Sequence, residues 1–324
     1  MQSILVTGGM GYIGSHTVVE LLENNYEVII VDNLINSKLE VLDNIVKITG
    51  KRPKFYQYDL CNQNDLEQVF KENKIDAVIH FAGLKAVGES VQKPLLYYQN
   101  NLVSTLNLLE VMTKHNCKKL VFSSSATVYG TPKSLPIKED FPLSTTNPYG
   151  STKLFIEYML KDLYKSDPTW SIAILRYFNP IGAHSSYLLG EDPNGIPNNL
   201  MPYIVKVATK ELDHLNIFGN DYETKDGTGV RDYIKAIEKT MKSNQVDCYN
   251  LGTGHGYSVL EIVNTFERIN NIKVPYQITK RRDGDIAECY ADPSYAKQEL
   301  NFTCTKTLED MVRDSYQYRV KNRK

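Results

Sequence analysis

The sequence has no surplus of charge of either sign and no long apolar run. It contains 37 Lys and Arg residues against 38 Asp and Glu residues, which gives a net charge of -1 in 324 residues. Binding to a nucleic-acid backbone needs an excess of basic residues, so this balance argues against such a partner. No stretch approaches the roughly 18 consecutive apolar residues of a membrane-spanning helix. We therefore expect neither a nucleic-acid nor a membrane partner.

Paired cysteines and a secretion signal are also missing. The five cysteines are an odd number, widely spaced and without Cys-x-x-Cys, which fits a reducing compartment better than a disulfide framework. The first residues contain neither the basic region nor the apolar region of a signal peptide. We expect no metal site. Together these features predict a soluble, cytoplasmic protein.

Short apolar runs alternate with helical patterns through the first half of the chain. The run at 28–31 is apolar without interruption, which is typical of a parallel strand buried on both faces. Similar runs lie at 4–6, 55–58, 77–80 and 120–122. This alternation favours an α/β fold with a doubly wound parallel sheet.

Glycine and proline become frequent after about residue 179. At roughly 150 residues per domain, the length of the chain suggests two domains. We predict a first domain over 1–179 and a second, smaller mixed α/β domain over 180–324. Some segments, at about 229–252, are expected to return to the first domain. The second half is expected to contain strands at 217–218 and 249–251 and a helix at 259–269.

A glycine-rich loop follows the first predicted strand. Residues 7–14 read Thr-Gly-Gly-Met-Gly-Tyr-Ile-Gly and satisfy Gly-x-Gly-x-x-Gly. Glycines there permit a tight turn and close approach to a pyrophosphate, and the following helix offers free backbone N–H groups. Asp32 ends the second predicted strand, at the spacing expected for a carboxylate that binds a ribose, and favours NAD over NADP. The alternative is that Asp32 is only a helix cap or turn residue.

Tyr149 and Lys153 lie four residues apart at the start of a predicted helix, so their side chains share one face. An ammonium near a phenol lowers the pKa of the phenol, and a cationic nicotinamide would lower it further. Tyr149 could then act as base and acid near pH 7. Ser125 follows the run at 120–122, at the strand end where open α/β sheets bind ligands. Each feature alone is expected by chance, but together with the glycine loop they predict a catalytic site.

These features, with several further motifs, resemble the extended short-chain dehydrogenase/reductase family and, within it, the UDP-sugar 4-epimerases. The resemblance covers nearly the whole chain. The segments that carry it are Val-Thr-Gly-Gly-Met-Gly-Tyr-Ile-Gly-Ser-His at 6–16, Phe-Ala-Gly-Leu-Lys-Ala-Val-Gly-Glu-Ser at 81–90, Ser-Ser-Ser-Ala-Thr-Val-Tyr-Gly at 123–130, Asn-Pro-Tyr at 147–149, Arg-Tyr-Phe-Asn-Pro at 176–180, Asn-Asn-Leu-Met-Pro at 198–202, Ile-Phe-Gly-Asn-Asp-Tyr at 217–222 and Asp-Gly-Thr-Gly-Val-Arg-Asp-Tyr-Ile at 226–234.

The resemblance implies an isomerase with a Rossmann-like NAD-binding domain followed by a mainly UDP-sugar-binding domain. It would interconvert UDP-galactose and UDP-glucose through a 4-keto sugar, without net oxidation or reduction. Tyr149 would remove the proton of the sugar 4-hydroxyl. Ser125 would hold the 4-oxygen, and Lys153 would tune Tyr149 and bind the nicotinamide ribose.

The resemblance also implies the residues around both ligands. Its cofactor positions are Gly8, Gly11, Tyr12, Ile13, Gly14, Asp32, Asn33, Asp59, Leu60, Phe81, Ala82, Gly83, Lys85, Asn100, Ser123, Tyr149, Lys153 and Tyr177. Its substrate positions are Lys85, Ser125, Tyr149, Phe178, Asn179, Asn199, Leu200, Asn216, Phe218, Arg231, Arg282, Asp285 and Cys289. Arginine side chains suit a diphosphate. Without their motifs, Arg231 and Arg282 would be read as surface ion-pair residues.

The chain departs from the family pattern at two places. Cys289 stands where family members carry either a bulky Tyr or a small residue beside the sugar, so a thiol predicts room for N-acetylated sugars. The alternative is that Cys289 is only a small buried apolar residue. After Ile234 the family pattern continues for about ten residues, close to three helical turns, that are missing before Lys235. Such a gap, close to Arg231, could weaken nucleotide binding or folding.

Alternative functions follow from the same scaffold. The gap would suit a pseudoenzyme that only binds NAD and a UDP-sugar, although Ser125, Tyr149 and Lys153 are all present. A nucleotide-sugar dehydrogenase would release reduced cofactor. A 4,6-dehydratase usually has Asp-Glu after the catalytic hydroxyl, whereas Ala-Thr follows here. Family members usually form homodimers through two long helices, expected here at 94–115 and 149–166.

Overall fold

The central feature of the computed structural model, which describes residues 1–194, 199–218, 244–280 and 289–323, is a parallel sheet. Its strands are β1 (Ser3–Thr7), β2 (Glu27–Val31), β3 (Lys54–Tyr56), β4 (Ala77–His80), β5 (Lys119–Ser125), β6 (Ser171–Tyr177) and β8 (Val246–Leu251). They lie in the order β3-β2-β1-β4-β5-β6-β8, with every neighbouring pair parallel. This arrangement confirms the predicted doubly wound α/β fold.

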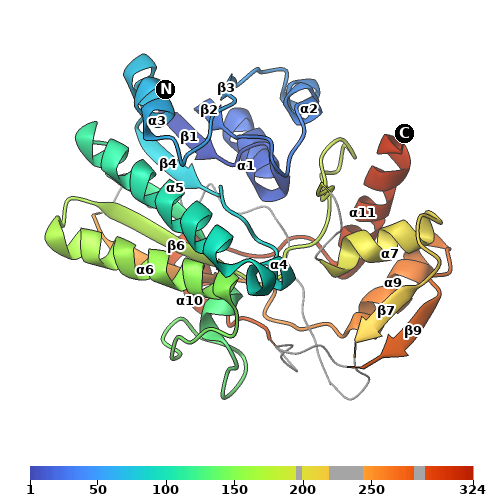
Figure 1. Ribbon diagram of the computed structural model, residues 1–324. Coiled ribbons are helices and arrows are strands. Elements are labelled where there is room, and N and C mark those ends of the chain that lie inside the picture. The colour runs from blue at the N-terminus through green and yellow to red at the C-terminus, as the bar shows by residue number, and fades with distance from the viewer. Residues whose placement is uncertain (195–198, 219–243, 281–288, 324) are drawn as a thin grey trace.

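Helices cover both faces of this sheet. They are α1 (Tyr12–Glu23), α2 (Glu40–Thr49), α3 (Gln63–Glu72), α4 (Val87–Gln92), α5 (Pro94–Lys114) and α6 (Pro148–Ser166). Alternation along β1 explains the two layers: Ile4 packs in one core cluster with α1 and α2, and Leu5 packs in the other with α3, α5 and α6. Figure 1 shows α5 and α6 side by side, as their contacts require.

A smaller group of elements lies to one side of the sheet (Figure 1). It contains α7 (Leu200–Ala208), β7 (Leu215–Phe218), α9 (Val259–Asn270), β9 (Tyr276–Thr279) and α11 (Leu308–Asn322). Strands β7 and β9 form a parallel pair, and the three helices share a separate apolar core that includes Phe266 and Val312. In contrast, α10 (Ser294–Leu300) packs on the core of the large sheet through Ala296 and Leu300.

The structure agrees with most of the elements expected from the sequence. Strand β8 lies within the segment expected to return to the first domain, and it pairs with β6. Strand β6 itself was not predicted, although it is buried along nearly its whole length. Within the described residues, no helix is long and apolar enough to cross a membrane. All five cysteines are free thiols.

Candidate active site

The glycine loop joins β1 to α1 and is closely packed. A Cβ atom on Gly14 would lie 2.2 Å from the carbonyl oxygen of Gly8, and one on Gly8 would lie 2.7 Å from the backbone nitrogen of Ala82. Gly8 also has a φ of +69°, which favours glycine. Gly11 precedes α1 and has no side chain to cap it, so the first N–H groups of the helix are left without a capping acceptor. This cradle fits a pyrophosphate.

Asp32 links the glycine loop to the loop after β2. Its carboxylate is buried and accepts hydrogen bonds from the backbone N–H groups of Met10, at 3.0 Å, and Leu34, at 2.9 Å. Asp32 therefore also stabilises a turn, which was the alternative to ribose binding expected from the sequence. Beside it, the Nδ2 of Asn33 donates to the carboxylate of Asp59 at 3.1 Å. Three of the predicted cofactor residues therefore meet at the carboxyl ends of neighbouring strands.

Asn101, on α5, positions the segment that follows β4. Its buried amide accepts a hydrogen bond from Leu84 N–H at 2.8 Å and donates to the Leu84 carbonyl at 3.0 Å. It also donates to the Thr152 hydroxyl on α6 at 3.0 Å. Asn101 thus holds the predicted segment from Phe81 to Lys85 against the helix that carries Tyr149. Asn101 was not predicted from the sequence, although a polar side chain on the apolar face of a helix was a usable signal.

Ser125 and Tyr149 come together at the carboxyl end of β5. Ser125 is the last residue of β5, and its hydroxyl accepts hydrogen bonds from the Thr127 N–H and hydroxyl groups at 3.2 and 3.0 Å. Tyr149 lies in the first turn of α6, whose N-terminus is capped by the side chain of Asn147. Burial raises the pKa of the Tyr149 phenol, and a hydrogen bond with the Ser125 side chain opposes part of that rise.

Lys153 lies one turn after Tyr149 and is buried. Its Nζ donates to the Ser123 carbonyl at 2.7 Å and lies 6.0 Å from the centroid of the Tyr149 ring. Burial lowers the pKa of Lys153 to about 8. In this structure burial of the phenol sets the net direction of its pKa, and the expectation that Lys153 together with a bound nicotinamide lowers that pKa stays a prediction.

The shifted pKa of Lys153 makes a prediction for stability. The unfolded chain has a lysine pKa near 10.4, so below about pH 8 both states are protonated and the burial penalty is fully present. Between about pH 8 and 10.4 only the unfolded state keeps the proton, so Lys153 destabilises the fold less as pH rises. We expect the free energy of unfolding of wild type, relative to Lys153→Met, to rise by up to about 3 kcal/mol from pH 7 to 10. Urea unfolding of both proteins across this pH range measures the difference in free energy of unfolding. A difference that does not change with pH would contradict the prediction.

A buried ion pair fixes the strand ends beside these residues. The guanidinium of Arg176 binds both carboxylate oxygens of Glu157 on α6, at 3.0 and 2.6 Å, and both side chains are almost fully buried. Glu157 also accepts from the Ser124 hydroxyl at 2.6 Å. Since Ser124 is paired with Arg176 across β5 and β6, this cluster aligns their ends, where Ser125 lies opposite Tyr177.

The predicted substrate residues are brought together only in part. Phe178 is buried, and Cys289 packs against the cluster that contains Phe178 and Ala126, close in the chain to Ser125. Asn179 has a φ of +44°. Other predicted positions lie on the smaller group of elements: Asn199 and Leu200 at the start of α7, and Asn216 and Phe218 on β7. Arg231, Arg282 and Asp285 lie outside the described residues.

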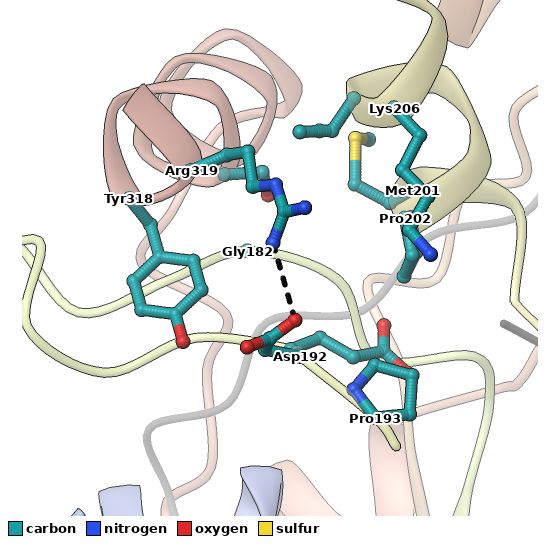
Figure 2. A pocket seen from close by; sticks show the side chains of 11 residues that line it. Gly182, Asp192, Pro193, Met201, Pro202, Lys206, Tyr318 and Arg319 are labelled. Atoms are coloured by element: carbon teal, nitrogen blue, oxygen red, sulfur yellow. Dashed lines mark hydrogen bonds and ion pairs between the residues drawn. The ribbon is translucent and has the colours of Figure 1, made fainter. Parts of the chain in front are cut away.

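A small pocket lies between α7, α11 and the segment after β6. Figure 2 shows Arg319 of α11 directed to Asp192, with a 3.3 Å ion pair between them, and Met201 and Pro202 of α7 on the opposite wall. Lys38, from the loop after β2, also pairs with Asp192. Ser125, Tyr149 and Lys153 are not among the lining residues, so this pocket does not contain the candidate catalytic group.

Comparison with known proteins identifies the family. A family model described as GDP-mannose 4,6 dehydratase matches residues 5–315. The UDP-glucose 4-epimerase of Bacillus subtilis is 58% identical over 99% of this chain and 98% of its own length. A crystal structure of the Bifidobacterium longum UDP-glucose 4-epimerase in complex with NAD+ and UDP is 53% identical, has a TM-score of 0.95 and is matched over 99% of both chains. This chain belongs to the UDP-glucose 4-epimerase family.

Two other UDP-glucose 4-epimerases also match this chain over nearly its whole length. The Stenotrophomonas maltophila UDP-glucose 4-epimerase with bound NAD and formylated UDP-arabinopyranose is 43% identical, with a TM-score of 0.96 over 99% of this chain and 98% of its own. The Pasteurella multocida UDP-glucose 4-epimerase is 55% identical, over 100% of this chain and 99% of its own length.

The chain is shorter than the alignment with that relative. The alignment covers 334 positions and this chain has 324 residues, so about ten positions (334 less 324) have no residue here. That number agrees with the gap expected after Ile234. Ile234 and Lys235 themselves lie outside the described residues.

Proposed function

We propose that this chain is an NAD-dependent UDP-glucose 4-epimerase that interconverts UDP-galactose and UDP-glucose through a 4-keto sugar. The observation that supports this most strongly is the hydrogen-bonded pair of Ser125 and Tyr149, one helical turn from buried Lys153, beside a glycine cradle that fits a pyrophosphate. Membership in the UDP-glucose 4-epimerase family supports the same reaction.

Each catalytic side chain has a role that its position can perform. NAD, when bound, accepts a hydride and returns it. Tyr149 takes the proton of the sugar 4-hydroxyl and gives it back, while Ser125 holds the 4-oxygen through the hydroxyl that already contacts Tyr149. Lys153 is mostly protonated at neutral pH, and its positive charge favours the phenolate as the proton leaves Tyr149.

Conversion of UDP-galactose to UDP-glucose by the purified protein, without added reductant, tests this function. The expected result is turnover with no net change in absorbance near 340 nm. Accumulation of NADH would indicate a dehydrogenase. Absence of turnover, together with a ligand-induced rise in melting temperature on adding UDP-galactose, would indicate a pseudoenzyme that the gap after Ile234 has impaired. A dehydratase is disfavoured because Ala126 and Thr127, rather than carboxylates, follow Ser125.

N-acetylated UDP-sugars form a second substrate class in this proposal. Cys289 is partly buried against the cluster of Ala126 and Phe178, where a thiol occupies less room than a phenol. We expect turnover of UDP-N-acetylglucosamine by wild type and its loss in Cys289→Tyr, with UDP-galactose turnover retained in both. No turnover of the N-acetylated sugar by protein that is active on UDP-galactose would reject this extension.

A homodimer is the proposed assembly. Exposed apolar side chains gather on α4, α5 and α6, namely Val87, Val91, Leu95, Leu96, Val103, Leu106, Phe155 and Tyr158. On α6, Phe155 is exposed, whereas Met159 packs inside the chain. We expect light scattering to give the mass of two chains for wild type and one chain for Leu95→Glu/Phe155→Glu. A monomeric wild type would contradict the dimer.

The domain division at 179 and cytoplasmic residence are proposed as well. Free thiols at all five cysteines support a reducing compartment. The separate apolar core of α7, α9 and α11 supports a second domain. Limited proteolysis that cuts first near residue 179, and cell fractionation, would test the two statements.

A further inference from the structure

Glu191 joins two parts of the site that are far apart in the sequence. Its side chain is only 8% exposed and lies in the segment between β6 and α7. Its Oε1 accepts a hydrogen bond from the Nδ2 of Asn199 and lies 3.4 Å from the Nζ of Lys85, which is 106 positions away in the chain. Lys85 follows β4, on the side of the glycine cradle, whereas Asn199 precedes α7. One carboxylate oxygen therefore holds a residue from each side.

Asn199 does not perform the role that its position favours. It is the N-cap residue of α7, where asparagine usually accepts a hydrogen bond from the first turn, yet its side chain makes no capping bond. Asn62 and Asn147 do cap α3 and α6 in that way. Pro202 occupies the third position of α7 and has no N–H, so Asn199 could cap only the Met201 N–H, and its amide nitrogen binds Glu191 instead. The N–H groups of Leu200 and Met201 therefore keep no capping acceptor from Asn199, which leaves them open to an anionic group.

The second oxygen of Glu191 supports a role beyond packing. Its Oε2 is buried and has no hydrogen-bond partner among the described residues. A buried carboxylate oxygen without a donor is costly, and a residue kept for stability alone would be expected to satisfy both oxygens. The cost of this unpartnered oxygen is explained if the carboxylate is present to hold Lys85 and Asn199 in place.

We propose that Glu191 is a positioning residue for the UDP-sugar. It holds Lys85 and Asn199 on either side of the substrate diphosphate before the substrate arrives, and this statement rests on the proposed function. Lys85 is 42% exposed, so without Glu191 its long side chain would be free to move and binding would have to order it. Without Glu191, Asn199 would also be free to cap α7 and obstruct its N-terminus.

Calorimetric titration of the NAD-loaded protein with UDP tests the proposal. We expect Glu191→Ala to bind UDP about tenfold more weakly, because two side chains must then be ordered on binding. Glu191→Gln keeps an acceptor oxygen and removes the charge, so it should stay within about threefold of wild type. Glu211→Gln is the matched control. It removes an ion pair with Arg319, which lines the pocket of Figure 2, without touching Lys85 or Asn199.

A double-mutant cycle separates positioning from structural damage. If Glu191 acts through Asn199, Glu191→Ala/Asn199→Ala should bind UDP no more weakly than the weaker single variant. In turnover, Glu191→Ala should raise KM for UDP-galactose with little change in kcat, and its melting temperature should match that of wild type. A lowered melting temperature with unchanged UDP affinity would overturn the proposal. The proposal would also be overturned if Glu191→Ala bound UDP as tightly as wild type or more tightly. Repulsion between the Glu191 carboxylate and the diphosphate would then be the dominant effect.

The same measurements distinguish this inference from the proposed function. A wild type that binds UDP but does not convert UDP-galactose would overturn the epimerase activity and leave the role of Glu191 in binding testable by the affinities alone. An active wild type whose UDP affinity is insensitive to Glu191→Ala would overturn only the inference. A wild type that binds no UDP would overturn both.

Discussion

Replacing Tyr149 with phenylalanine is expected to lower kcat for UDP-galactose by about 10² to 10⁴, the usual contribution of a positioned acid and base. The phenol is the only group of the proposed trio that changes protonation during the reaction. Its hydrogen bond with Ser125 places it at the carboxyl end of β5, and the capped, proline-started N-terminus of α6 fixes its backbone. Phenylalanine preserves the ring and removes only the proton carrier.

The substitution is expected to slow the chemical step and to leave ligand binding unchanged. NAD content and UDP affinity of Tyr149→Phe are expected to match wild type, because the glycine cradle and the start of α7 are not altered. Tyr164→Phe is the matched control on the same helix, since its hydroxyl only reaches the Asn244 carbonyl at 3.5 Å. Turnover that survives in Tyr149→Phe would mean that another group transfers the proton.

The parts of the site that the sequence predicted are those defined by short motifs. The glycine loop needs only the order of glycines between a strand and a helix, and Tyr149 with Lys153 needs only one helical turn. Both depend on local geometry, which spacing specifies directly. The same holds for Ser125, because it ends a strand whose apolar run is visible in the sequence.

The features that the sequence did not predict depend on contacts between segments that are distant in the chain. Glu191 is one of many carboxylates until the fold brings it to Lys85, 106 positions away. Strand β6 is buried yet carries the charged Arg176 just before its last residue, and the partner on α6 explains why that charge is tolerated there. Spacing also could not predict that burial raises the pKa of Tyr149, because burial depends on the whole surrounding structure.

Replacing Glu157 with glutamine is expected to lower the free energy of unfolding by about 3–5 kcal/mol, because it leaves the buried guanidinium of Arg176 without its counter-charge. Burial acts to lower the pKa of Arg176, but the hydrogen bond and charge of Glu157 raise it by more, so the arginine stays ionised in the core. Neither side chain is more than 1% exposed, and water cannot replace the lost partner. Urea unfolding measures the difference.

A paired substitution tests whether the loss comes from the unpaired charge. Glu157→Leu/Arg176→Met removes both charges and keeps apolar volume, so it should be more stable than Glu157→Gln. The pair also aligns β5 with β6 through Ser124, so the double variant is expected to fold while losing turnover at the adjacent Ser125. A Glu157→Gln protein within about 1 kcal/mol of wild type would show that Tyr129 and the Glu139 carbonyl, which also bind Arg176, are sufficient to hold the charge.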